Sequence, residues 1–190
     1  MTDANIHDDL LRSLTGDGVA YGRVVKETQA FALRLARRLL GPSDEAEDVV
    51  QEAFIRVWNN LSRFDEHQKF TTWLYTIVSN LCMDHLRARR RQEARFVRLD
   101  PAAELGDPAS ASGERGSAQE LATIVARIAQ RLPPQQQLVF TLRDIEDLSV
   151  DEVMRITSLS ARTIKANLYY ARRAVREALK TELHITGSES

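Results

Sequence analysis

The chain has 190 residues, a hydrophobic fraction of 43% and a formal net charge of −1. These values are typical of one or two small globular domains, and they exclude a disordered chain; no segment approaches the roughly 20 consecutive apolar residues of a membrane helix. The single cysteine, Cys82, excludes an internal disulfide framework and a multi-cysteine zinc site.

The N-terminal segment and the histidines bear on where the protein is located and on whether it binds a metal. The acidic start, MTDANIHDDLL, lacks the basic-then-apolar pattern of a secretory signal, which favours a cytoplasmic protein. The four histidines have no metal-ligand spacing. We therefore predict no metal, no cofactor and no small-molecule substrate.

The small net charge conceals three segments of strongly segregated charge. Residues 44–66 hold seven acidic side chains against two arginines, residues 84–98 hold six arginines against two acids, and residues 155–176 hold six basic side chains and no acid. Two basic segments favour binding to a polyanion, and the acidic one favours a different partner. Solvated charged faces are the alternative, which explains one such segment more readily than three.

Helical periodicity dominates the first half of the chain. We predict a short helix within 6–18, a second over about 19–40 that Gly41-Pro42 ends, a third that Ser43 or Asp44 caps, and a fourth from Phe70 into the arginines. Acidic residues in the first turn of the third helix favour the positive end of its dipole. A polar loop over 62–69 separates the third and fourth helices.

The periodicity fades after about residue 92 and resumes near residue 118. The intervening stretch is rich in Pro, Gly, Ala and Ser, which is the composition of a linker. We therefore predict an all-α protein with two helical domains, 1–95 and 118–184. A flexible linker over 96–117 joins them, and 185–190 form a disordered tail.

The second domain contains a pattern that fits a helix-turn-helix. Ser149 can cap a first helix over 150–156, a tight turn passes through Ser158, and Ser160 can cap the second helix. The N-terminal half of such a second helix enters the major groove, and flanking cations neutralise phosphates. The side chains predicted to face DNA are Arg162, Lys165, Ala166, Tyr169, Tyr170, Arg172 and Arg173. An αα-corner has the same apolar spacing, but the unopposed positive charge favours DNA binding.

Four blocks of the sequence, in this order, resemble one known family. They are AEDVVQEAFIRVWNNLSRFD, FTTWLYTIVSNLCMDHLRARRR, LPPQQQLVFTLRDIEDLSVDEV and ARTIKANLYYARRAVREAL. Together they look like a bacterial sigma factor of the extracytoplasmic-function group, group 4 of the sigma-70 family, which contains only regions 2 and 4. The resemblance spans about residues 10–181. It assigns region 2 to the first domain and region 4 to the second.

The resemblance implies a stress-response transcription initiation factor rather than an enzyme. Such a factor binds core RNA polymerase, melts the minus-ten promoter element with region 2 and reads the minus-thirty-five element with region 4. The family is usually held inactive by an anti-sigma factor, here expected to be membrane-linked. That partner would hold this cytoplasmic bacterial protein at the inner membrane.

The third helix has an exposed face that acids would keep away from phosphates, so we expect it to meet protein. The resemblance implies docking on the clamp helices of the beta-prime subunit of polymerase. The face consists of Asp48, Gln51, Glu52, Ile55 and Asn59. Ile55 is apolar amid polar neighbours, which is typical of an anchor at an interface. The opposite face, which includes Trp58, is predicted to be core.

The fourth helix is predicted to expose Tyr75, Asn80 and Met83 opposite an apolar stripe that includes Trp73. Capturing an unstacked base requires stacking and hydrogen bonds to its edges, chemistries that Tyr75 and Asn80 supply. The resemblance adds that the loop over 63–69 accepts a flipped base. The predicted minus-ten contacts are Arg63, Phe64, Lys69, Tyr75, Asn80, Arg87, Arg90 and Arg91.

The sequence also departs from the family pattern in region 4. Ser158 stands where the turn usually has glycine, Ala166-Asn167 where the recognition helix commonly has Ser-Arg, and Tyr170 where it has a basic residue. The face therefore carries fewer charges than is usual, and we do not transfer the family's usual minus-thirty-five sequence preference to this chain. Tyr169 and Tyr170 could pack on thymine methyls, bind phosphate or contact an inhibitor.

Three other functions compete with that of a sigma factor. A decoy that binds an anti-sigma factor could lose the cationic face of region 4, yet that face is present. A dimeric helix-turn-helix regulator explains residues 132–181 and leaves the acidic face without a use. An enzyme would require a phosphate loop, a metal cluster or an activated nucleophile, and the sequence has no such pattern.

Overall fold

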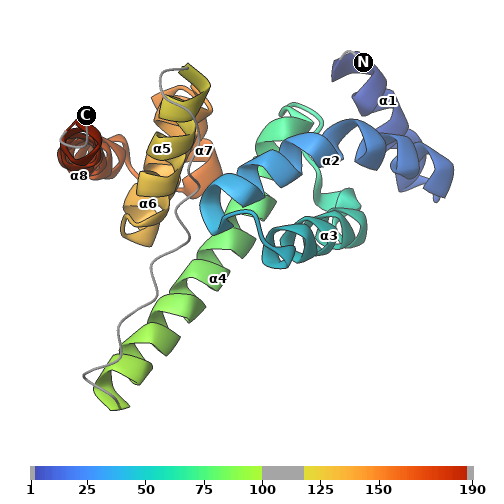
Figure 1. The fold of residues 1–190 in the computed structure, drawn as a ribbon. Coiled ribbons are helices and arrows are strands. Elements are labelled where there is room, and N and C mark those ends of the chain that lie inside the picture. The colour runs from blue at the N-terminus through green and yellow to red at the C-terminus, as the bar shows by residue number, and fades with distance from the viewer. Residues whose placement is uncertain (1–2, 100–117, 188–190) are drawn as a thin grey trace.

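The computed structural model describes residues 3–99 and 118–187 (Figure 1). In these ranges all regular secondary structure is helical, which confirms the all-α prediction. The elements are α1 (Asp3–Leu14), α2 (Gly18–Leu40), α3 (Asp44–Asn59), η1 (Leu61–Arg63), α4 (Phe70–Leu99), α5 (Ala118–Gln130), α6 (Pro134–Phe140), η2 (Thr141–Ile145), α7 (Val150–Thr157) and α8 (Ala161–Gly187).

The ends of α2 and α3 follow from capping chemistry. The Asp17 carboxylate accepts hydrogen bonds from the backbone N–H groups of Val19 and Ala20, each 3.0 Å long, and so caps α2. Gly41 ends α2 with φ 91°, a conformation that favours glycine. Ser43 precedes α3 in an extended conformation, but its hydroxyl makes no capping hydrogen bond. The acidic first turn of α3 therefore supplies the main complement to its dipole.

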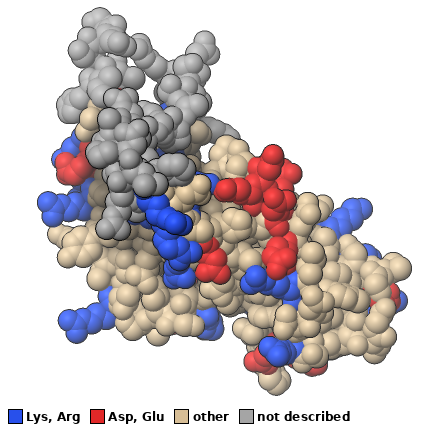
Figure 2. Space-filling view, turned by 90° about the horizontal axis from the view of Figure 1, so that it is seen from below, with Lys and Arg blue, Asp and Glu red and all other residues tan. Residues whose placement is uncertain are grey.

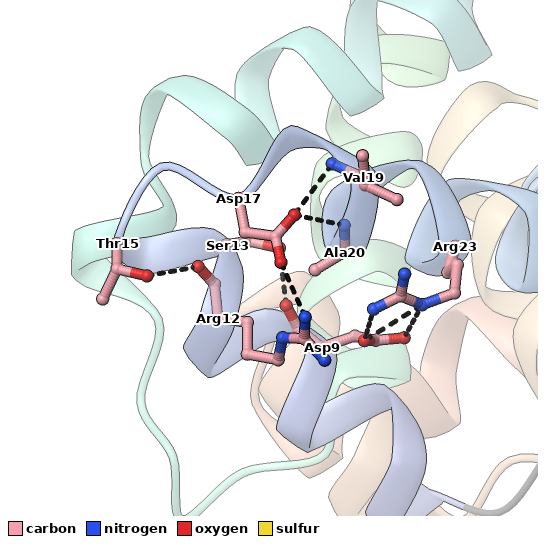
Figure 3. Close-up of polar contacts among 8 residues, drawn as sticks. All are labelled: Asp9, Arg12, Ser13, Thr15, Asp17, Val19, Ala20 and Arg23. Carbon is pink, nitrogen blue, oxygen red and sulfur yellow. Dashed lines mark hydrogen bonds and ion pairs between the residues drawn. The ribbon is translucent and has the colours of Figure 1, made fainter.

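The corner between α1 and α2 is held by ion pairs (Figure 3). Asp9 is only 7% exposed, and its Oδ2 accepts a hydrogen bond of 3.0 Å from Nε of Arg23. Arg12 pairs with the capping Asp17 at 3.0 Å. The hydrogen bond from Arg23 is the main cause that holds the pKa of Asp9 below its ordinary value. The corner thus depends on a carboxylate that is stabilised in its charged form.

We expect Asp9→Asn to lower the melting temperature at pH 7, because Arg23 loses its charged partner. The pKa of Asp9 is lowered on folding, so its contribution is present above the ordinary value of 3.8 and is lost as the pH falls through the lower folded pKa. Melting curves by circular dichroism from neutral to acid pH should show the difference from wild type shrinking below about pH 4. The control is Asp8→Asn, at an exposed neighbour. A difference that stays constant down to the lowest pH would contradict this assignment.

Both groups of helices pack on α4. In Figure 1, α1 and α3 lie on one side of α2 and the upper part of α4, and α5–α8 lie on the other. Helix α4 contacts α2 and α3 from the first half of the chain and α6 and α7 from the second. The buried apolar side chains form one continuous cluster that includes Leu35, Leu74 and Val139. The two predicted domains therefore share one core in this structure.

Two helices extend beyond their predicted ends. Helix α4 runs through Leu99 and includes residues 96–99 of the predicted linker, whereas residues 100–117 lie outside the described part of the chain. Helix α8 runs through Gly187 and includes residues 185–187 of the predicted tail. In both cases the helix continues past the last apolar residues at helical spacing, so periodicity alone does not predict where it ends.

The helix-turn-helix forms as the sequence predicts. Ser149 and Glu152 form a reciprocal capping box at the start of α7. The turn that follows places Ser158 in the left-handed region with φ 57°. Ser160 then accepts a hydrogen bond of 3.2 Å from the backbone N–H of Thr163 at the start of α8. Serine residues thus set both helix starts and the turn between them.

A π-helical turn, η2, follows α6 without interruption. It closes when the backbone N–H of Glu146 donates to the carbonyl oxygen of Thr141 over 2.9 Å, five residues earlier. The Glu146 side chain comes directly after this wide turn and points toward the first half of the chain, where its partners lie.

We expect Ser158→Gly to stabilise the chain by about 0.5–1 kcal/mol, because glycine adopts the left-handed conformation without the cost that a Cβ imposes. The measurement is urea denaturation followed by circular dichroism. The matched variant is Asp147→Gly at φ 55°. It should gain less, since aspartate tolerates this conformation better than serine does. Equal stability of Ser158→Gly and wild type would show that the turn is unstrained.

Candidate nucleic-acid and protein interfaces

The acidic face of α3 is exposed as predicted. Asp48, Gln51, Ile55 and Asn59 all face solvent, and Ile55 is 55% exposed. Glu52 is half-buried and pairs with Arg56 one turn later, at 2.8 Å. Figure 2 shows the largest group of acidic side chains gathered in one patch, while smaller acidic groups lie beside basic side chains elsewhere in this view. An exposed isoleucine within a polar face suits docking to a protein.

Trp58 extends the apolar part of this surface, contrary to the prediction that it is core. It is 40% exposed, and its ring lies 4.9 Å from that of Tyr21. The Tyr21 hydroxyl donates to the carbonyl oxygen of Phe54 over 2.5 Å, and burial raises the pKa of Tyr21 above its ordinary value. A hollow of about 280 Å³ beside Trp58 is also lined by Leu14 and Leu61. The indole therefore sits at the rim of the core, available to a partner.

The loop before α4 is built on a group of aromatic rings. Phe64 packs against Phe70 and Trp73, with ring centroids 6.0 and 5.2 Å apart. Arg63 and Lys69 at the ends of the loop are exposed. A hollow of about 240 Å³, lined in part by Phe64 and Lys69, lies between this loop and α1. The arrangement combines an apolar surface with nearby positive charge.

The outer side of α4 presents an amide and several arginines. Asn80 and Arg91 are exposed, and Arg87 lies 3.5 Å from Asp84 on the same helix. Arg90 is exposed too, but its guanidinium donates to the carbonyl oxygen of Leu132 over 2.8 Å. The arginines at the end of α4 thus give a cationic flank that is only partly neutralised.

Tyr75 does not lie on an outer face, and that prediction is wrong. It is 6% exposed, and its ring meets Phe31 edge to face at 4.5 Å. Its hydroxyl donates to Oε2 of Glu146 over 2.9 Å. Burial, followed by the charge of Glu146, raises its pKa above the ordinary value. Met83, also predicted to be outward, is buried as well.

The recognition helix α8 exposes the side chains predicted to face DNA, at Arg162, Lys165, Ala166, Tyr169, Tyr170, Arg172 and Arg173. Tyr169 and Tyr170 are 62% and 55% exposed, with ring centroids 5.4 Å apart. The Arg172 guanidinium makes two hydrogen bonds to Asp144, of 2.8 and 2.7 Å. These bonds raise the pKa of Arg172 and fix its orientation. The helix thus offers aromatic rings flanked by cations.

Sequence reasoning missed Arg38 and Glu146, which join the two halves of the chain. They form an ion pair between α2 and the end of η2, and the Glu146 side chain is only 8% exposed. No local pattern could have revealed this pair, because its members are 108 positions apart.

None of the described helices has both the length and the apolar content that a bilayer span requires. Within the described ranges no group of three His, Cys, Asp or Glu side chains could hold a metal ion.

Comparison with known proteins identifies both halves. The family model of sigma-70 region 2 matches residues 24–92, and that of sigma-70 region 4 matches residues 122–175. The ECF RNA polymerase sigma factor SigW of Bacillus subtilis (strain 168) is 30% identical over 171 residues, which cover 87% of this chain and 91% of SigW.

Two solved structures have a similar fold. One is CnrH in complex with the cytosolic domain of CnrY, with a TM-score of 0.64 and 22% identity over 93% of this chain and 98% of that one. The other is RpoE in complex with the anti-sigma factor NepR from Bartonella quintana, with a TM-score of 0.63 and 21% identity over 84% of this chain and 96% of that one. The family matches and the identity to SigW show that the chain belongs to the sigma-70 family, in its extracytoplasmic-function (ECF) group.

Proposed function

We propose that the chain is an alternative sigma factor that binds core RNA polymerase and directs promoter-specific initiation. The observation that carries this proposal is one chain with two different exposed surfaces. One is the acidic α3 face centred on Ile55, and the other is the basic and aromatic face of α8. Acidic side chains repel a phosphate backbone and suit a protein partner, whereas the α8 face suits a major groove. The factor acts by binding, without covalent chemistry of its own.

The α3 face is the proposed polymerase surface. It consists of Asp48, Gln51, Glu52, Ile55 and Asn59, and its target is the clamp helices of the beta-prime subunit. The exposure of Ile55 beside carboxylates supports this role, because an apolar anchor within a charged rim is typical of protein interfaces. Trp58 and Leu14 adjoin the face and are proposed to enlarge its apolar contact.

Region 2 is proposed to hold the non-template strand of the minus-ten element. The hollow beside Phe64 and Lys69 would take a flipped base, and Asn80 would hydrogen-bond to a neighbouring base edge. Arg63, Arg87, Arg90 and Arg91 would contact phosphates. Tyr75 would stack on a base only after region 4 moves away, since it is buried in the closed arrangement.

Region 4 is proposed to read the minus-thirty-five element. Ala166 leaves room for close approach to the groove, and Tyr169 and Tyr170 offer rings to thymine methyl groups. Arg162, Lys165, Arg172 and Arg173 would neutralise phosphates. A linker between the regions would let one chain occupy both elements, which multiplies affinity through effective concentration.

An anti-sigma factor is the proposed regulator. The family is the first support, and the RpoE structure of similar fold, which contains the anti-sigma factor NepR, illustrates the class of partner. We propose that the chain works in the bacterial cytoplasm and is held at the inner membrane when its anti-sigma factor is membrane-linked.

The proposal is tested with purified chain, core RNA polymerase and run-off transcription on a promoter library. We expect wild type to bind polymerase and give promoter-specific transcripts, and Asp48→Arg with Ile55→Asp to lose polymerase binding while still binding duplex DNA through region 4. The matched control reverses charge and polarity on α2, with Glu27→Arg and Val19→Asp, both exposed. Undiminished polymerase binding by the α3 variant would refute the assignment of that face. No transcript from wild type would refute the function.

We expect Asn80→Ala to impair promoter melting more than closed-complex binding, because Asn80 would contact bases only after they unstack. The loss of one hydrogen bond, about 1–2 kcal/mol, would lower the open complex roughly 5- to 30-fold. Permanganate footprinting measures melting, and gel shift at low temperature measures closed-complex binding. Gln29→Ala, which removes an exposed amide from α2, is the control. Equal losses in both assays would rule out the melting role.

A further inference from the structure

We propose that region 4 inhibits DNA binding by the minus-ten surface of region 2, which consists of the loop over 63–69 and the proposed DNA contacts of α4. Glu146 is the latch that holds region 4 against α4. In the free chain the segment from η2 to α7 packs on α4 and keeps Tyr75 buried, so that promoter DNA cannot reach this residue. This inference rests on the proposed function only for the identity of the covered surface. The closure itself rests on contacts between the two halves of the chain.

The latch is a buried carboxylate with two partners from region 2. The Glu146 side chain is 8% exposed, forms an ion pair with Arg38 and accepts the hydrogen bond from the Tyr75 hydroxyl. A carboxylate this deeply buried is costly without partners, and removal of one partner leaves an uncompensated charge. The closed arrangement is therefore favoured by specific polar contacts in addition to apolar burial.

Hydrogen bonds from side chains to backbone carbonyl groups also join the two halves of the chain. Gln137 of α6 is 1% exposed, and its Nε2 donates to the carbonyl oxygen of Leu39 over 2.6 Å. The Leu39 carbonyl lies in the last turn of α2, where carbonyl groups lack partners within the helix. Arg90 of α4 donates in the opposite direction, to the carbonyl oxygen of Leu132. Side chains of each half thus donate hydrogen bonds to backbone carbonyl oxygens of the other half, as expected for a specific interface.

Two of the residues proposed to contact DNA are engaged by region 4. Tyr75 is buried and donates a hydrogen bond to Glu146, and Arg90 donates one to the carbonyl oxygen of Leu132. Asn80 and the other proposed minus-ten cations stay exposed. The Glu146 carboxylate of region 4 therefore lies against a residue proposed to contact the minus-ten element, where DNA would bring its own negative charge.

This arrangement makes promoter binding a competition within one chain. DNA that needs Tyr75 exposed binds only the open form, so its apparent dissociation constant rises by the inverse of the open fraction. If the free chain is open about one time in ten, opening it fully tightens binding roughly tenfold. Polymerase or promoter binding would supply the free energy of opening.

The test measures the distance between the two regions in the full chain. Spin labels are attached to the double variant Lys26→Cys in α2 and Ala174→Cys in α8, at two exposed positions. The native Cys82 is fully buried, and burial raises its pKa to about 12, so it should not compete for the label. Fluorescence anisotropy of a labelled random pool of 20-nucleotide single-stranded DNA gives the dissociation constant of its complex with the chain. This constant reports how accessible the minus-ten surface is.

Glu146→Lys places a positive charge against Arg38, so we expect a longer, broader distance distribution and roughly tenfold tighter single-strand binding. The matched control, Asp144→Lys, adds the same charge two positions earlier, where the partner Arg172 lies within region 4. It should keep the short distance. The double variant Arg38→Glu with Glu146→Lys reverses the pair and should close the chain again, which separates opening from misfolding.

A long distance in wild type, or a short one in Glu146→Lys, would overturn the latch. Opening in both Glu146→Lys and Asp144→Lys would also overturn it, because charge alone would then be the cause. Run-off transcription by wild type is independent of these outcomes. A chain that opens as expected but fails to transcribe refutes the proposed function, and a chain that transcribes without a distance change refutes the latch.

Discussion

The packing of α4 is the interaction on which the rest of the structure depends. Its apolar stripe, which includes Leu74 and Val78, belongs to the common core, and the helix packs against α2 and α3 from the first half of the chain and α6 and α7 from the second. Each half of the chain is small, and domains of that size bury a smaller fraction of their surface on folding than larger domains do. Sharing one helix gives both halves a larger core than either would have alone.

Helix positions and surface polarity could be predicted from the sequence because they depend on neighbours along the chain. The capping box of Ser149, the glycine that ends α2 and the exposed Ile55 all follow from spacing within a few residues. Burial of Tyr75 could not be predicted, because its cover comes from Phe31 and Glu146, far away in sequence. Tyrosine suits either side of a helix, since its ring is apolar and its hydroxyl polar. The prediction that Trp58 is core is wrong because a large ring at the edge of the apolar stripe of α3 can extend beyond the core.

The proposed minus-ten surface of α4 would serve two partners of different chemistry. In the closed chain, α4 packs against α6 and α7, and its side chains hydrogen-bond to the Glu146 carboxylate and the Leu132 backbone carbonyl. Nucleic acid offers comparable groups, namely flat apolar bases, anionic phosphates and carbonyl oxygens on base edges. Arginine and tyrosine serve both sets because each combines hydrogen bonding with a planar face. One sequence can therefore satisfy the interior of the free protein and the contacts of a bound one.

The π-helical turn η2 makes the direction of Glu146 depend on how this turn is wound. Its hydrogen bond spans five residues, so each position in the turn advances less around the axis than it would in an ordinary α-helix. If the same residues were wound as an α-helix, the carboxylate would rotate away from Arg38 and Tyr75. Helices α7 and α8, with the recognition face, would keep their own sequence. Substitutions that favour ordinary α-helical winding in this turn would thus be a short evolutionary route from a self-closing factor to a constitutively open one.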